Sequence, residues 1–252
     1  MYRTLISQSL YYYCLAEWLL LQELLSDYWA RFAAISCSVK SFSDFQQTGR
    51  LDAEYYQPKY DELEQRLSAH ECKPLGDIVS IKKSVEPGSD CYQENGILFV
   101  RVSDVSKFGI SQTDLHLSPQ EFSLEALRPH KDTILLSKDG SIGIAYKCET
   151  DLDVITSGAL LHLNIVDSAF LPDYVTLVLN SIVVHLQAER DSNGAIIQHW
   201  KPDDIKHVAI PILALETQRA IAEKIQRSFS LRTESKRLLE QAKAMVEAEI
   251  DG

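Results

Sequence analysis

The sequence predicts an α+β protein in which one mixed α/β body lies between a long helix at each end of the chain. Two observations carry this prediction. Residues 215–250 repeat apolar side chains close to heptad spacing and contain no proline or glycine, which indicates one helix of roughly 50 Å. Residues 74–170 instead hold short apolar runs separated by Gly, Asp, Ser or Pro, which is typical of strands.

The N-terminal elements come first in chain order. Residues 8–28 carry apolar side chains three and four positions apart, so they predict a helix within an N-terminal segment 1–30. Residues 31–73 are expected to be a linker, with a loop that ends at Gly49 and a short helix near 57–70.

The body is expected to extend over residues 74–214. The pieces between its apolar runs are too short for regular βαβ crossovers, which favours an antiparallel or mixed sheet over a doubly wound one. The expected strands begin at Leu75, Ile97, Thr133, Ile142 and Ala159. Residues 171–190 return to helical spacing, with Pro172 near the start of the helix.

The C-terminal helix, residues 215–252, needs a partner, because a helix of this length cannot bury its apolar stripe on a body at one end only. An antiparallel helix from the same chain, a second copy of the chain, or both would cover the stripe. We expect dimerisation through this helix.

Composition limits the class of protein. The net charge of −11 argues against nucleic-acid binding when taken alone, but phosphates respond to local charge within ~8–10 Å. The five cysteines are odd in number and spread singly, so neither a disulfide framework nor a zinc site is expected, and the cytoplasm fits best. Residues 10–25 are apolar but contain Glu17 and Glu23, so no membrane span is expected.

The sequence also lacks the common signatures of catalysis and metal binding. Its histidines form no H-x-x-x-H pair, no G-x-S-x-G elbow is present, and no phosphate-binding glycine pattern occurs. We therefore expect no enzymatic activity, no metal and no cofactor.

Several stretches in a fixed order carry a family resemblance. They include Leu51-Asp-Ala-Glu-Tyr-Tyr-Gln-Pro-Lys-Tyr, Pro74-Leu-Gly-Asp-Ile, Ile97-Leu-Phe-Val-Arg-Val-Ser-Asp-Val, Leu136-Ser-Lys-Asp-Gly-Ser-Ile-Gly and Ser192-Asn-Gly-Ala-Ile-Ile-Gln. Together with the start of the terminal helix, they resemble the specificity subunits of type I restriction-modification enzymes. In this resemblance, Pro74-Leu-Gly-Asp-Ile corresponds to the first strand of a target recognition domain.

The resemblance implies a non-catalytic subunit that reads double-stranded DNA and docks methyltransferase subunits and, through them, the restriction subunit. Its flanking helices would form an antiparallel, coiled-coil-like spacer. The family usually has two recognition domains in one chain, each reading half of a split target, whereas this chain has one. A homodimer would restore two domains and read two identical half-sites in inverted orientation.

Candidate DNA-binding side chains fall in three groups. Basic side chains in or beside predicted loops can neutralise phosphates. They are Lys82, Lys83, Arg101, Lys107, Lys138, Lys147, Lys201 and Lys206. For any single one a solvated surface charge is the better explanation, and the cluster is a stronger indication than any member. Polar side chains that can read base edges are Ser103, Gln112, Asn193 and Gln198, but Asn193-Gly194 is also a favoured hairpin turn. Tyr146 can pack against sugars or bases, and Ser141 lies in a turn whose backbone N–H groups can meet a phosphate.

Two other functions stay open. An acidic, dimeric protein-interaction adaptor that does not bind DNA is favoured by the net charge of −11. A stand-alone nuclease is the third alternative, since two Glu-x-Lys triplets occur, but neither follows a suitable Asp on a strand.

Overall fold

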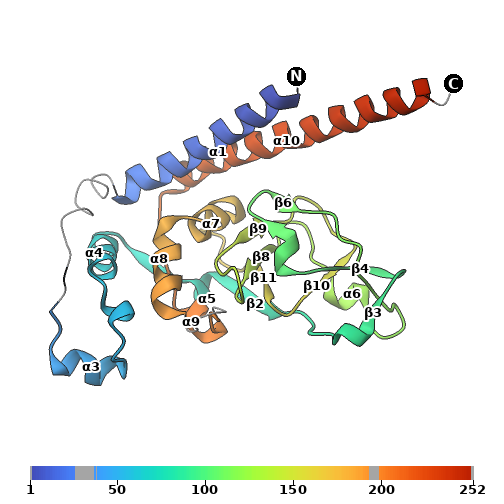
Figure 1. Cartoon of the computed structure of the whole chain (residues 1–252). Helices are drawn as coiled ribbons and strands as arrows, with labels where there is room; N and C mark the ends of the chain where they lie inside the picture. The colour runs from blue at the N-terminus through green and yellow to red at the C-terminus, as the bar shows by residue number, and fades with distance from the viewer. Residues whose placement is uncertain (1, 26–36, 38, 193–198, 251–252) are drawn as a thin grey trace. The chain divides into compact units, whose positions relative to one another are not determined.

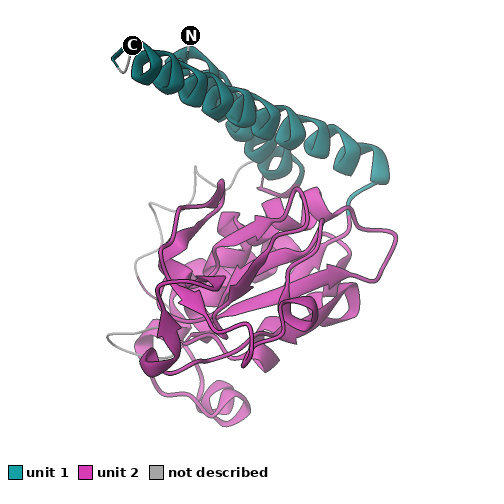
Figure 2. Ribbon diagram, turned by 90° about the vertical axis from the view of Figure 1, so that its right-hand side faces the viewer, with its two compact units in different colours: residues 1–23, 213–252 teal, residues 24–212 magenta. Residues whose placement is uncertain are grey.

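The computed structural model describes residues 2–25, 37, 39–192 and 199–250. The chain divides into two compact units, coloured separately in Figure 2: residues 1–23 with 213–252, and residues 24–212. The first is helical and the second is a mixed α/β unit. The α+β class expected from the sequence is therefore confirmed.

Two long helices, α1 (Tyr2–Leu25) and α10 (Leu215–Ile250), form the helical unit and lie side by side (Figure 1). Helix α10 continues for 36 residues because no proline or glycine interrupts it. Ion pairs three residues apart support its exposed surface, as between Arg237 and Glu234 at 2.6 Å.

Serine contacts fix the register of the two helices. The Ser9 and Ser228 hydroxyl oxygens lie 2.9 Å apart, and the Ser235 hydroxyl donates to the Tyr2 carbonyl at 3.3 Å. A step of seven residues back along α1 therefore matches a step of seven residues forward along α10, so the helices are antiparallel. Of the partners considered for the C-terminal stripe, a helix of the same chain is thus present.

That helix covers only part of the stripe. Ile221, Ile225 and Leu231 are buried, whereas Met245 is 74% exposed and Ile250 is 76% exposed. The end of α10, residues 241–250, is therefore exposed, and it includes the apolar side chains of Met245, Val246 and Ile250.

The α/β unit contains two four-stranded sheets. The first is antiparallel throughout, in the order β2 (Val79–Lys83), β11 (Leu160–Ile165), β8 (Ile134–Ser137) and β9 (Ala145–Lys147). The second is mixed, with β10 parallel to β4, in the order β10 (Val154–Thr156), β4 (Ile97–Val100), β7 (His116–Leu117) and β3 (Tyr92–Gln93). The expectation of antiparallel or mixed pairing is confirmed.

Shorter elements complete this unit. The two-stranded pairs are β1 (Cys72–Pro74) with β12 (Ala209–Pro211), and β5 (Val105–Ser106) with β6 (Gly109–Ile110). Among the described residues, the remaining helices are α3 (Phe42–Thr48), α4 (Pro58–Leu67), α5 (Leu75–Ile78), α6 (Leu124–Leu127), α7 (Pro172–Leu179), α8 (Ile182–Asp191) and α9 (Pro202–Lys206), with the 3₁₀ turns η1 (Ala53–Tyr56), η2 (Ser89–Cys91) and η3 (Val102–Asp104).

Strand β4 has a core on each of its faces. Phe99 packs with Leu117 and Ile155, whereas its neighbour Val100 packs with Val105 of β5 and with Leu160 of the antiparallel sheet. Adjacent residues of a strand point to opposite faces, so one strand holds the two sheets together. This packing fixes where β4 ends, directly before Arg101.

Two local predictions were wrong. The strand expected from Leu75 begins only at Val79, because Leu75 and Ile78 lie three residues apart and bury together on the short helix α5. The expected loop before Gly49 contains α3, whose start is capped by reciprocal hydrogen bonds between Ser41 and Asp44.

Candidate nucleic-acid interface

The segment Ser157–Ala159 brings the ends of three strands together. The Ser157 N–H donates to the Val100 carbonyl at 2.8 Å, and the Gly158 N–H donates to the Val85 carbonyl at 2.6 Å. The Ala159 carbonyl accepts from the Lys138 N–H at 2.9 Å. The last residue of β4 and residues that follow β2 and β8 therefore meet at one edge of the unit.

Gly158 permits this close meeting. A Cβ added at this position would lie 2.6 Å from Cγ of Glu86 and 3.0 Å from Cε of Lys83. Both are side-chain atoms, so any larger residue would displace the charged groups of this edge rather than its backbone.

Five polar side chains gather here, and we call them the strand-end cluster: Lys83, Glu86, Lys138, Asp139 and His199. Lys83 pairs with Glu86 at 2.8 Å, and Asp139 accepts from both Lys138 and His199. His199 is held in place by its neighbour in the chain, because the Trp200 N–H donates to the Lys138 carbonyl at 2.8 Å. The Trp200 side chain is 1% exposed and anchors this strand-like contact.

The two neighbouring lysines of β2, Lys82 and Lys83, have different partners. Lys83 joins the strand-end cluster, whereas the Lys82 ammonium donates to the Ala126 carbonyl of α6. Successive side chains of a strand point to opposite faces, so a Lys-Lys pair cannot place both charges on one patch. Of this pair, the structure brings only Lys83 into the cluster.

A second group surrounds Asp104, immediately after β4. The Arg101 guanidinium lies 3.6 Å from the Asp104 carboxylate, and the Ser103 hydroxyl donates to the same carboxylate at 3.1 Å. Lys107 lies on the β5–β6 hairpin and Gln112 is exposed just beyond it. The four predicted residues of this group therefore share one loop region, joined to the strand-end cluster through the end of β4.

The other predicted residues differ in accessibility. Ser141 is exposed, and its carbonyl accepts from the Ser137 hydroxyl at 2.5 Å. Lys201 is exposed at the start of α9. Tyr146 packs against the core that Val100 of β4 forms with Val105 and Leu160, and burial raises the pKa of Tyr146 to about 12. Asn193 and Gln198 lie outside the described residues.

Lys138 and Lys147 are buried rather than solvated. Lys138 follows β8 and its ammonium is held by Asp139. Lys147 lies within β9, where its ammonium is 2.8 Å from the Asp173 carboxylate and 3.2 Å from that of Glu149. Burial alone would lower the pKa of Lys147, but the hydrogen bonds and charges of Asp173 and Glu149 together outweigh burial and raise it. Lys147 is the last residue of β9 and so lies beside a loop, but its ammonium is buried against Asp173 rather than presented to solvent.

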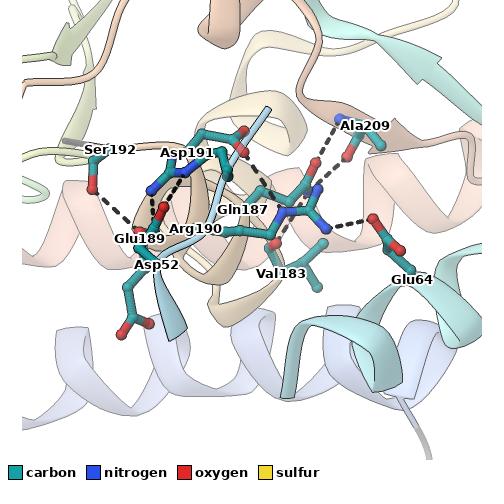
Figure 3. A network of polar contacts seen from close by, with 10 residues as sticks. Asp52, Glu64, Val183, Gln187, Glu189, Arg190, Asp191, Ser192 and Ala209 are labelled. Carbon is teal, nitrogen blue, oxygen red and sulfur yellow. Dashed lines mark hydrogen bonds and ion pairs between the residues drawn. The ribbon is translucent and has the colours of Figure 1, made fainter. Parts of the chain in front are cut away.

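A separate charged network, on α8, has a structural role. Figure 3 shows Arg190 held by Glu64 of α4 and by Asp191, while Gln187 bonds both backbone polar groups of Ala209. These contacts tie α8 to α4 and to β12. They fix the helix that precedes residue 193 in the chain, and none of them belongs to the strand-end cluster.

Charge is distributed unevenly along the chain. Residues 24–212 contain 17 Lys and Arg against 27 Asp and Glu, so the α/β unit carries most of the acidic excess. Carboxylates such as Asp104, Asp139 and Glu86 pair with the basic side chains of the candidate interface. In the described part of the chain, no group of three metal-ligating side chains forms and no helix is long and apolar enough to cross a membrane.

No sequence pattern indicated that Asp139 and His199 form a pair. They are 60 residues apart, and only the pairing of their backbones brings the side chains together. In the sequence, Asp139 stands next to a glycine within Leu136-Ser-Lys-Asp-Gly-Ser-Ile-Gly, and His199 is one of seven histidines that form no recognisable motif.

Comparison with known proteins places this geometry in context. A family profile described as "Type I restriction modification DNA specificity domain" matches residues 69–244. No curated protein matches the chain significantly.

Three solved structures match part of this chain. An S subunit of a type I restriction-modification system from M. genitalium is 18% identical, with a TM-score of 0.45 over 61% of this chain and 37% of that chain. The HsdS subunit from Thermoanaerobacter tengcongensis is 19% identical, with a TM-score of 0.46 over 67% of this chain and 39% of that one. The type IIG restriction endonuclease BpuSI is 9% identical, with a TM-score of 0.53 over 74% of this chain and 30% of that one. The chain thus spans less than half of each of these structures.

Proposed function

The chain belongs to the type I restriction modification DNA specificity family, and from this premise we propose that it is a non-catalytic subunit that reads one half of a split DNA target. The α/β unit would contact the DNA, and the helical unit would dock a methyltransferase subunit and a second copy of the chain. Cleavage and methylation would be performed by the partner subunits.

The observation that carries the DNA-reading role is the convergence of strand ends at Ser157–Ala159. Loops held by rigid strands can present side chains to base edges at fixed positions. Recognition of a DNA sequence requires such fixed positions. Lys83 and Arg101, both exposed at this edge, would contact phosphates, and Ser103 and Gln112 would reach base edges. Lys138 would support the site from within, because its ammonium is already held by Asp139.

The docking role rests on the uncovered apolar surface of the helical unit. On α10, Met245, Val246 and Ile250 are exposed, and on α1 Tyr11 and Trp18 are 64% and 54% exposed. Exposed aromatic and aliphatic side chains on a regular helix are typical of an interaction face. Two copies joined through α10 would bring two α/β units into one assembly.

Selection of binding sites from a random DNA library tests this proposal. The full chain, alone and co-expressed with a type I methyltransferase subunit, is expected to enrich two identical half-sites in inverted orientation. Light scattering should give twice the monomer mass. Enrichment of no motif, even with the methyltransferase subunit present, would sink the DNA-reading role.

The acidic adaptor is kept as the second candidate because residues 24–212 carry the acidic excess. Salt dependence separates the two functions. Contacts with phosphates release counterions, so DNA binding should weaken steeply from 50 to 200 mM salt, by roughly tenfold or more for a few contacts. Binding that is absent at low salt would favour the adaptor.

A further inference from the structure

His199 is the exposed end of a chain of three polar residues. Its Nδ1 atom lies 2.8 Å from Oδ1 of Asp139, and the other carboxylate oxygen of Asp139 accepts from the Lys138 ammonium. The side chains of His199, Asp139 and Lys138 are 63%, 23% and 11% exposed, respectively. The two inner residues are therefore held within the unit, and the imidazole reaches solvent.

The state of Asp139 decides which ring nitrogen carries the proton. Burial alone would raise the pKa of the Asp139 carboxyl, but hydrogen bonds from Lys138 and His199 outweigh burial and hold its pKa below the ordinary value. An ionised carboxylate accepts hydrogen bonds and donates none. The proton in the contact with His199 therefore belongs to Nδ1, which leaves Nε2 of the neutral ring as a hydrogen-bond acceptor.

An acceptor at this position selects its ligand. Phosphate oxygens are themselves acceptors, so they do not match Nε2 of the neutral ring. The exocyclic amino groups of adenine and cytosine do match, and they are the hydrogen-bond donors of the major groove. Guanine and thymine present acceptors at the corresponding edge and would be disfavoured.

We propose that His199 reads one base pair of the target by accepting, at Nε2, a hydrogen bond from the amino group of adenine or cytosine, and that Asp139 and Lys138 are positioning residues that fix its tautomer. This inference rests on the proposed function. The remaining members of the strand-end cluster, Lys83 and Glu86, pair with each other and leave the Asp139 carboxylate to His199 and Lys138.

The test compares the sequence preference of the full chain with that of three variants, His199→Ala, Asp139→Asn and His185→Ala. His185 is an exposed histidine of α8 and serves as the matched control. Binding-site selection with the wild-type chain should show adenine or cytosine at the position that His199 reads. His199→Ala should lower discrimination at that one position by roughly 5- to 100-fold and leave the other positions unchanged.

Asp139→Asn tests the positioning role. An asparagine amide can donate to Nδ1 as well as accept from it, so the tautomer is no longer fixed and Nε2 can become a donor. We expect the preference at the same position to relax toward guanine or thymine. ¹⁵N NMR of the imidazole gives a readout that does not depend on DNA: the wild-type ring should carry its proton on Nδ1. Unchanged thermal unfolding of each variant shows that the fold is intact, and His199→Ala keeps the test valid if Asp139→Asn fails to fold.

Three results would overturn the inference: an unchanged sequence preference in His199→Ala, a loss of affinity that is equal for all sequences, or a proton on Nε2 in the wild-type ring. If the wild-type chain itself enriches no motif, the proposed function fails and this inference fails with it. If the wild-type chain selects a motif and the variants select the same one, only the inference fails.

Discussion

Acidification probes the packing around His162, a buried histidine in the middle strand of the antiparallel sheet. His162 is 4% exposed, and its Nε2 atom lies 2.7 Å from the Thr156 hydroxyl oxygen. Burial, and after it the positive charge of Lys82 on the paired strand, lower its pKa from 6.5 to about 4. The native protein therefore keeps this ring neutral where an unfolded chain would protonate it.

The sign and size of the effect follow from this difference. Between pH 6.5 and 4 the unfolded state binds a proton that the folded state refuses, so stability is full above pH 6.5 and falls as the pH drops toward 4. A pKa lowered from 6.5 to about 4 corresponds to about 3 kcal/mol, of which about 2–3 kcal/mol is lost by pH 4.5.

Urea unfolding of the wild-type chain and of His162→Gln at pH 7.5, 6.0, 5.0 and 4.5 measures this loss. Glutamine keeps hydrogen-bonding groups beside Thr156 but has no proton to take up in this range. The difference in unfolding free energy between the two proteins should shift in favour of the variant by about 2–3 kcal/mol from the highest to the lowest pH. His185→Gln, at an exposed position, controls for general acid effects. The reasoning would be refuted if the free energy of unfolding of the wild-type chain and that of His162→Gln depended on pH in the same way.

Three further predictions concern packing and association. Asp173→Ala should lower the free energy of unfolding in urea by about 3 kcal/mol, because it removes the closest carboxylate from the buried Lys147 ammonium. The double change Asp173→Leu with Lys147→Met should recover most of this loss, and an equal loss in both variants would contradict the ion-pair explanation. Gly158→Ala should change the free energy of unfolding by less than about 1 kcal/mol but weaken DNA binding in a gel-shift assay, because the new Cβ would lie 2.6 Å from Cγ of Glu86 and displace that flexible side chain. Unaltered DNA binding would show that this edge is not part of the interface. Val246→Lys should lower the mass seen by light scattering without lowering the melting temperature, and an unchanged mass would remove the end of α10 from the joining surface.

Local patterns predicted the elements whose neighbours in sequence decide their conformation. The long helix α10 follows from the absence of proline and glycine over 215–250 and from its heptad spacing. The short apolar runs predicted β4, β8 and β11. The prediction failed at Leu75–Ile78, where an apolar run buries as a helical turn, because the partners of Leu75 and Ile78 lie far away in the sequence.

The candidate interface was predictable only in outline. The sequence indicated basic and polar loop residues, but it did not separate Lys82 from Lys83, which the strand places on opposite faces. It also did not indicate that Lys147, at the end of β9, is buried in an ion pair with Asp173 at the start of α7. In each case the deciding partner comes from another strand or helix.

The amino-acid sequence by itself determined the α+β class, the two terminal helices, the family and the set of residue types available for DNA contact, since these depend on periodicity, composition and ordered motifs. The tertiary structure alone decided which of those residues meet. Ser157–Ala159 joins three strand ends, and Asp139 reaches His199 across 60 residues. Hydrogen bonds between distant backbone groups set these positions, and a pattern confined to neighbouring residues does not encode which distant groups will pair.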